Sequence, residues 1–153
     1  MPDSIRELIV KDIVTELAEI TTANGWTTNV QSVQRYNQAG QITSSMPMIL
    51  VAEGQERGSE GPNPLAEYDL DIWVMVFSRD DGSGRSSSEI LNEFCADVMT
   101  KLQEDPTRGG YAIDTGVPDR DPEDFETKTP HFGTFLTVPV KFRTLRANPR
   151  LQA

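Results

Sequence analysis

The stretch that decides the fold runs from Tyr68 to Phe77 and reads YDLDIWVMVF. Side chains alternate between the two faces of a strand, so one face carries Tyr68, Leu70, Ile72, Val74 and Val76. The other face carries Trp73, Met75 and Phe77 beside Asp69 and Asp71. A strand that is apolar on both faces needs cover on both sides. We expect a helix of the same chain to cover one face, and a loop or another subunit to cover the other.

The composition is that of one folded domain without a membrane span. The chain has 153 residues, 37% of them hydrophobic, and its mean hydropathy is −0.44. No apolar run approaches the roughly 20 residues that cross a bilayer. The first residues show no signal sequence, and the single cysteine, Cys95, excludes an internal disulfide framework. We expect a protein made and kept in a cytoplasm, with one domain over residues 1–146 and a mobile C-terminal tail over 147–153.

Two amphipathic helices flank the central strands. Ser4 with Glu7 and Ser86 with Glu89 have the spacing of capping boxes, so helices are predicted over residues 4–23 and from Ser86 to Gln103. Strands are predicted over residues 28–36, 48–52, 68–77, 111–117 and 132–145. This order favours an α+β fold, a mostly antiparallel sheet of four to five strands with two helices packed on one face.

The connection from Glu53 to Glu67 is rich in glycine, proline and charge, and it is predicted to be a long loop at the tip of a hairpin. Pro139 interrupts the last strand and cannot donate a backbone hydrogen bond. The strand is therefore bulged there or lies at an edge of the sheet.

Charge is distributed unevenly along the chain. Residues 1–126 hold all 24 acidic residues and nine basic ones, whereas residues 127–153 hold five basic residues and no acid. One interpretation is a solvated acidic body with a basic end. The other is that the basic end docks on an acidic surface of a neighbouring subunit. An acidic body of this kind is a poor general binder of nucleic acid.

Catalytic chemistry has little support in the sequence. Asp69 and Asp71 share a strand face and could hold a divalent cation, but no motif supplies further ligands, so a polar stripe is favoured. His131 lacks the partners of a catalytic triad, and Cys95 lies on the apolar face of the second helix. The stretch Gly82 to Arg85 matches no phosphate-binding fingerprint and is interpreted as a flexible turn before a helix cap.

The whole-chain layout resembles the tail terminator, or tail completion, proteins of tailed bacteriophages. The features that carry the resemblance are the N-terminal helix from Ser4, the strand Met48–Ala52 with its long polar loop, the strand Tyr68–Phe77, the helix Glu89–Gln103 and the closing strand Phe135–Thr144. The resemblance implies a structural virion protein without catalytic residues, cofactor or metal.

In that family six subunits form a ring that caps the tail tube, contacts the tube protein and offers a surface to the head–tail connector or neck protein, while DNA passes through the pore without specific binding. The resemblance thus implies a virion protein at the tail–neck junction, assembled in the host cytoplasm. By analogy, the expected oligomer or tube interface comprises Glu53, Glu56, Arg57, Trp73, Lys141, Arg143, Arg146 and Arg150.

Two alternatives remain. One is a neck or head-completion protein of a phage particle, which binding to a portal or head instead of a tube would identify. The other is a small metal-dependent enzyme that uses Asp69 and Asp71, which a metal titration would identify.

Overall fold

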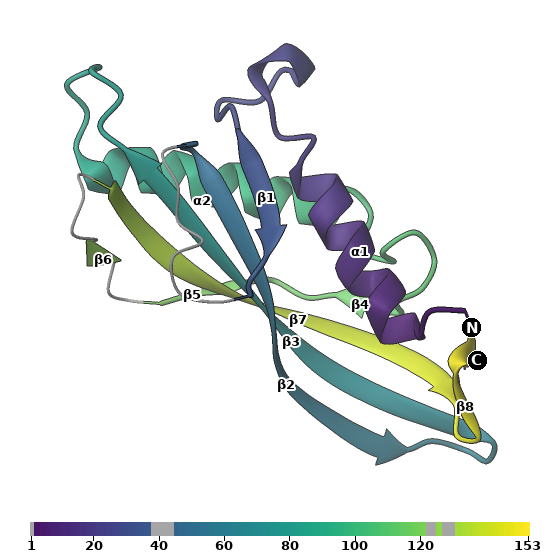
Figure 1. Cartoon of the computed structure of the whole chain (residues 1–153). Coiled ribbons are helices and arrows are strands. Elements are labelled where there is room, and N and C mark those ends of the chain that lie inside the picture. The colour runs from purple at the N-terminus through teal and green to yellow at the C-terminus, as the bar shows by residue number, and fades with distance from the viewer. Residues whose placement is uncertain (1, 38–44, 122–124, 127–130) are drawn as a thin grey trace.

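The computed structural model describes residues 2–37, 45–121, 125–126 and 131–153. The α+β class is confirmed, with two α-helices and a strongly curled sheet (Figure 1). In chain order the elements are α1 (Ile5–Leu17), the short 3-10 helix η1 (Thr22–Asn24), β1 (Ser32–Arg35), β2 (Met48–Glu60), β3 (Leu65–Arg79), α2 (Ser87–Glu104), β4 (Asp114–Thr115), β5 (Asp119–Arg120), β6 (Phe125–Glu126), β7 (His131–Leu145) and β8 (Asn148–Gln152).

The sheet differs from the predicted one in two ways. In the described residues it contains eight strands where four to five were predicted, and it is mixed, because β1 runs parallel to β2 while the other pairs are antiparallel. Strand β4 lies within the strand predicted over residues 111–117 but spans only two residues. Strands β5 and β6 also span two residues each, which is too short for an alternation of apolar and polar residues to reveal them.

Both helices begin where the sequence predicts. The Ser4 hydroxyl accepts a hydrogen bond from the backbone amide of Glu7, and Ser86 forms a complete capping box with Glu89. Helix α1 ends earlier than predicted, at Leu17. The chain then turns into η1, and Gly25, at φ +89°, ends η1 instead of the α-helix. None of the helices in the described ranges is long and apolar enough to cross a membrane.

The buried residues form two clusters. The larger one joins residues of α1 and α2, such as Ile13 and Phe94, to Leu70, Ile72, Val74 and Val76 of β3. These are the residues that the alternation of Tyr68–Phe77 assigned to one face. The smaller cluster comprises Met46, Met48, Leu50, Met75 and Phe77, with Ala52 and Phe135 packed against it. Its β3 members belong to the other face, so the prediction of apolar groups on both faces is confirmed.

The predicted long loop between Glu53 and Glu67 is wrong. Strand β2 continues to Glu60 and β3 begins at Leu65, so only residues 61–64 connect them. A bulge between Glu53 and Glu56 shifts the register, after which pairing resumes as far as Glu60 with Ala66. Polar and glycine-rich residues form strands here because the paired backbone of β3 satisfies their amides and carbonyls.

Strand β7 pairs with β3 over its whole length, from His131 opposite Arg79 to Leu145 opposite Leu65. Pro139 lies opposite Asp71, and its carbonyl accepts a hydrogen bond of 2.8 Å from the amide of Gly116. The Pro139 nitrogen points the same way as its carbonyl, towards the outer edge, so the ladder with β3 loses no donor. The segment 147–153, predicted as a tail, includes β8, which pairs with β7.

Candidate interaction surface

The residues predicted for an interface gather on one extension of the sheet, called the arm below. The arm comprises β2 from Glu53 onwards, β3 from Leu65 to Asp71, β7 from Pro139 onwards, and β8. Figure 1 shows it extending past α1 at the lower right. Of the predicted residues, Trp73 lies just before the arm begins, and the others lie on it: Glu53, Glu56 and Arg57 on β2, Lys141 and Arg143 on β7, Arg146 after β7, and Arg150 on β8.

One face of the arm carries alternating charges. Arg57, Asp69 and Lys141 are neighbours across three strands. Lys141 Nζ lies 3.9 Å from Asp69 Oδ1, and Arg57 Nη2 lies 3.6 Å from Asp71 Oδ2. One step nearer the tip, Arg143 Nε donates a hydrogen bond of 2.7 Å to Glu67. Basic residues of β7 thus face acids of their own chain. Exposed pairs of this kind contribute little to stability and remain available to a partner.

Two arginines in the last eight residues bind backbone carbonyls of other segments. Arg146 donates to the carbonyl of Leu65 at 2.8 Å and to that of Gly61 at 2.6 Å, which fastens the turn between β2 and β3. Arg150 of β8 donates to the carbonyl of Pro2 at 2.9 Å, which links the two ends of the chain. Both side chains have structural roles that the sequence did not indicate.

Ion pairs tie the base of the arm to α1 and β1. Arg6 of α1 donates a 2.7 Å hydrogen bond to Glu53 and lies 3.2 Å from Glu56, while Arg35 of β1 contacts Glu7 and Glu53. Partial burial works to lower the pKa of Arg6, but the hydrogen bond and charge of Glu53 raise it overall. The hydrogen bond with Glu7 is the main cause that raises the pKa of Arg35. Glu53 and Glu56 therefore set the position of the arm relative to the body.

Trp73 is 43% exposed beside the bulge in β2. Gly54 allows this packing, because a Cβ atom at position 54 would lie 2.8 Å from Trp73 Nε1 and 2.9 Å from the carbonyl oxygen of Asp71. The indole lies between the apolar cluster around Met75 and the charged face of the arm. A large aromatic side chain at such a boundary is a typical anchor for a partner.

The backbone of β2 offers an open edge on the arm. Strand β1 pairs only with Met48 to Val51, and within the described residues no strand pairs with the outer side of β2 beyond that point. The direction of the backbone groups in the arm follows from two hydrogen bonds on the outer side of β7. The carbonyls of Lys141 and Pro139 accept bonds there from the amides of Ile113 and Gly116, so odd-numbered residues of β7 point their backbone groups outward. Backbone groups of successive residues point to opposite sides of a strand.

Even-numbered residues of β7 therefore form backbone hydrogen bonds with even-numbered residues of β3, such as Val140 with Leu70. Odd-numbered residues of β3 then form their backbone hydrogen bonds with β2. By the observed register, Arg57 and Ser59 face β3, and Glu56, Gly58 and Glu60 point their backbone groups outward. On the opposite side of the arm, β4 pairs with β7 at Val140 and Lys141, and β8 pairs with it nearer the tip, at Thr144 and Leu145. The outer side of β8 is likewise unpaired with any strand in the described part of the chain. Towards its tip the arm is therefore a four-stranded antiparallel sheet, with β2 at one edge and β8 at the other.

Asp69 and Asp71 were the candidate ligands of a metal site. No group of three or more His, Cys, Asp or Glu side chains in the described ranges could hold a metal ion. Each carboxylate faces a cation instead, Lys141 for Asp69 and Arg57 for Asp71. Of the other candidates, Cys95 is buried in α2, and His131 lies at the first position of β7.

We expect the double substitution Asp69→Asn and Asp71→Asn to leave the metal content of the purified protein unchanged, because both carboxylates face cationic side chains. Elemental analysis of the wild-type and variant proteins after dialysis against Mg²⁺, Mn²⁺ or Zn²⁺ measures this. A divalent ion bound stoichiometrically by the wild-type protein and lost from the variant would restore the enzyme alternative.

Sequence reasoning missed the open edges and a pocket beside the N-terminus of α2. The edges depend on strands that a loop-like composition concealed. The pocket joins residues 27–29, Met46, Arg79–Asp81, Arg85 and α2. In that region the sequence indicated only a flexible turn from Gly82 to Arg85 before the helix cap. No protein-family model matches this chain, and no curated protein shows significant similarity to it.

Proposed function

We propose that this protein is a structural subunit that assembles into a closed homo-oligomeric ring through its arm. The observation that carries the proposal is that the two edge strands at the tip of the arm, β2 and β8, differ and that neither pairs with a further strand within the described residues. A head-to-tail contact joins two different patches and closes into a ring when the rotation between copies fits. Since the arm has an even number of antiparallel strands, β8 of one copy and β2 of the next would also run antiparallel, and the sheet would continue from copy to copy.

The charges of the two edges support this pairing. The β2 edge from Glu53 to Glu60 carries three glutamates and one arginine, whereas residues 146–152 carry two arginines and no acid. Arg6 and Arg35 already pair with Glu53 and Glu56, so Glu60, whose side chain is 87% exposed at the tip, is the acid of this edge that attracts residues 146–152. This attraction favours β2 against β8 over either edge against itself, and it speeds the encounter at low salt. The predicted interface residues Glu53, Glu56, Arg57, Arg146 and Arg150 all lie on these edges.

The faces of the sheet support the proposal as well. We propose that both helices cover one face, which holds the larger core cluster, so that the opposite face with Trp73 is left for contacts between subunits or with another protein. Because exposed ion pairs contribute little, Trp73 and the backbone hydrogen bonds of the edges must supply most of the affinity.

By its resemblance, we propose that the ring, of six subunits, is a tail terminator. It would cap the tail tube at the tail–neck junction, contact the head–tail connector or neck protein, and let DNA pass without specific binding. A neck or head-completion protein is the rival within the same class, and association with portal in place of tube ends would favour it.

Substituting Glu56 by proline tests the edge contact. Proline removes the outward amide at position 56 without removing a bond to β3, and prolines are tolerated at bulges and edges. One net backbone hydrogen bond contributes about 0.5–1.5 kcal/mol, so we expect association to weaken about three- to tenfold per contact. Light scattering over a range of protein concentrations, with and without tube protein, measures this.

The matched control is Glu56→Gln, which loses the ion pair with Arg6 as the proline variant does but keeps the amide. Removal of residues 147–153 should also weaken assembly and leave the domain folded. A wild-type protein that stays monomeric at every concentration and does not bind tube ends would rule out the ring.

A further inference from the structure

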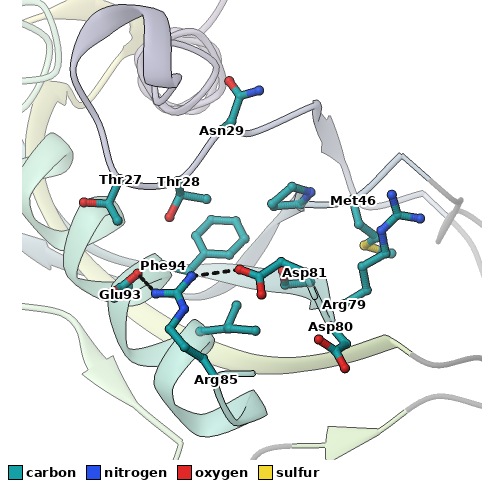
Figure 2. A pocket seen from close by; sticks show the side chains of 13 residues that line it. Thr27, Thr28, Asn29, Met46, Arg79, Asp80, Asp81, Arg85, Glu93 and Phe94 are labelled. Atoms are coloured by element: carbon teal, nitrogen blue, oxygen red, sulfur yellow. Dashed lines mark hydrogen bonds and ion pairs between the residues drawn. The ribbon is translucent and has the colours of Figure 1, made fainter. Parts of the chain in front are cut away.

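A cavity of about 530 Å³ lies at the Arg79 end of β3, opposite the end that forms the arm (Figure 2). Its apolar floor consists of Met46, Ile90 and Phe94, which are each at most 7% exposed. Its rim consists of the loop that follows β3 and the first turns of α2. The cavity therefore combines an apolar base with a polar opening.

The rim holds one pre-formed ion pair network. Figure 2 shows the guanidinium of Arg85 between the carboxylates of Glu93 and Asp81, and the distance to Asp81 is 2.9 Å. The hydrogen bond with Glu93 is the main cause that raises the pKa of Arg85. The hydroxyl of Ser83 and then Arg85 hold the pKa of Asp81 well below its usual range. The positive charge of Arg85 is thus already neutralised within the chain, by two carboxylates that together carry one negative charge more than Arg85 balances.

Acceptor groups without partners line the same cavity. Ser78 is 4% exposed and Thr28 is 9% exposed, and within the described residues neither hydroxyl makes a hydrogen bond. Oδ1 of Asp80 accepts a bond from the amide of Gly82, and its other oxygen has no partner in the described part of the chain. Among the described residues that line the cavity, Asp80, Asp81 and Glu93 carry three negative charges and Arg79 and Arg85 carry two positive ones, so their net charge is −1.

We propose that this pocket receives a lysine or arginine side chain from an extended segment of a partner protein. The methylene stem of such a side chain matches the apolar floor, and its head is purely a donor that matches Asp80 and the free hydroxyls. The negative rim favours a cation over an anion. Because the pocket and the arm lie at opposite ends of β3, this docking is independent of the proposed ring.

Ligand-observed NMR by saturation transfer tests the proposal on the intact protein, whatever its oligomeric state. The probes are the blocked tripeptides Gly-Arg-Gly, Gly-Lys-Gly and Gly-Glu-Gly. We expect saturation to reach the side-chain methylenes of the arginine and lysine peptides and not those of the glutamate peptide. Stronger saturation of the glutamate peptide would mean that Arg79 makes an anion site, which overturns the proposal, as would the absence of transfer to all three.

The variant Asp80→Asn keeps the acceptor for Gly82 and removes the charge. We expect it to weaken binding of the arginine peptide about two- to fivefold, the range for a single exposed ion pair. The matched control is Asp114→Asn, which removes an exposed carboxylate on β4 outside the pocket. Equal effects of both variants would mean that basic peptides respond only to overall charge, and no effect of Asp80→Asn would equally contradict a site in this pocket.

Discussion

Replacing Ile72 by aspartate is expected to cost several kcal/mol of unfolding free energy, enough to leave little or no folded protein. Ile72 lies near the middle of β3, opposite Val138 of β7, and it is fully buried in the cluster that contains residues of both helices. A carboxylate there has no cation within the cluster of apolar side chains. Circular dichroism during urea unfolding, or the soluble fraction on expression, measures the effect.

The control is Thr137→Asp, which introduces the same charge next to Trp73 on the other face of the sheet and should remain folded. A graded variant keeps the test informative if the aspartate variant is insoluble. Ile72→Val removes one buried methyl group and should cost about 0.5–1.5 kcal/mol. An aspartate variant that unfolds at the wild-type urea concentration would contradict the assignment of this face to the core.

The second large effect concerns Arg108, a charged side chain that is fully buried. Its Nη2 atom donates to the carbonyls of Leu102 and Asp105 at the end of α2, and its Nη1 atom lies 3.4 Å from Oδ2 of Asp12 in α1. Burial lowers the pKa of Arg108 and raises the pKa of Asp12, so desolvation outweighs their attraction. Arg108 also has a φ of +51°, which a non-glycine residue rarely adopts.

We expect Arg108→Met to lower the free energy of unfolding by about 3–5 kcal/mol, the usual cost of removing one partner from a buried pair. The methionine fills most of the volume, but the carbonyls of Leu102 and Asp105 lose their donor and Asp12 loses its cation. Urea unfolding measures the effect. Restoration by a second substitution, Asp12→Leu, would show that the orphaned carboxylate accounts for part of the loss.

Lys11→Met is the matched control for Arg108→Met. Lys11 lies on α1, as Asp12 does, and pairs with Asp3, which precedes that helix; the Lys11 side chain is 57% exposed. Its removal should change stability little. If both variants unfolded at the same urea concentration as the wild type, Arg108 would not connect α1 to α2 in the way described.

The strongest patterns in the sequence determined the elements of the core. The alternation in Tyr68–Phe77 predicted which residues share each face of β3, and the pairs Ser4 with Glu7 and Ser86 with Glu89 predicted the starts of both helices. These signals are reliable because hydrophobic burial and capping act on neighbouring residues, which the sequence displays directly.

The arm could not be predicted in the same way. The residues from Glu53 to Glu67 are polar on both faces, so they show no alternation, and their glycines and prolines favour a loop. Residues 53–60 extend β2 because β3 supplies hydrogen bonds along their length and because Gly54 accommodates the indole of Trp73 at the bulge. Both causes are contacts between residues on different strands, which local propensity does not record.

The sequence by itself thus determined the α+β class, the residues that share each face of β3 and the uneven distribution of charge. Only the tertiary structure decided that β1 is parallel to β2, that β8 extends the sheet, and that Arg57, Lys141 and Arg143 pair with acids of their own chain. Only it brought Ser78, Asp80 and Phe94 around one cavity. The physical reason is that pairing direction, edges and cavities arise from contacts between distant segments, whose free energies depend on geometry that no single segment contains.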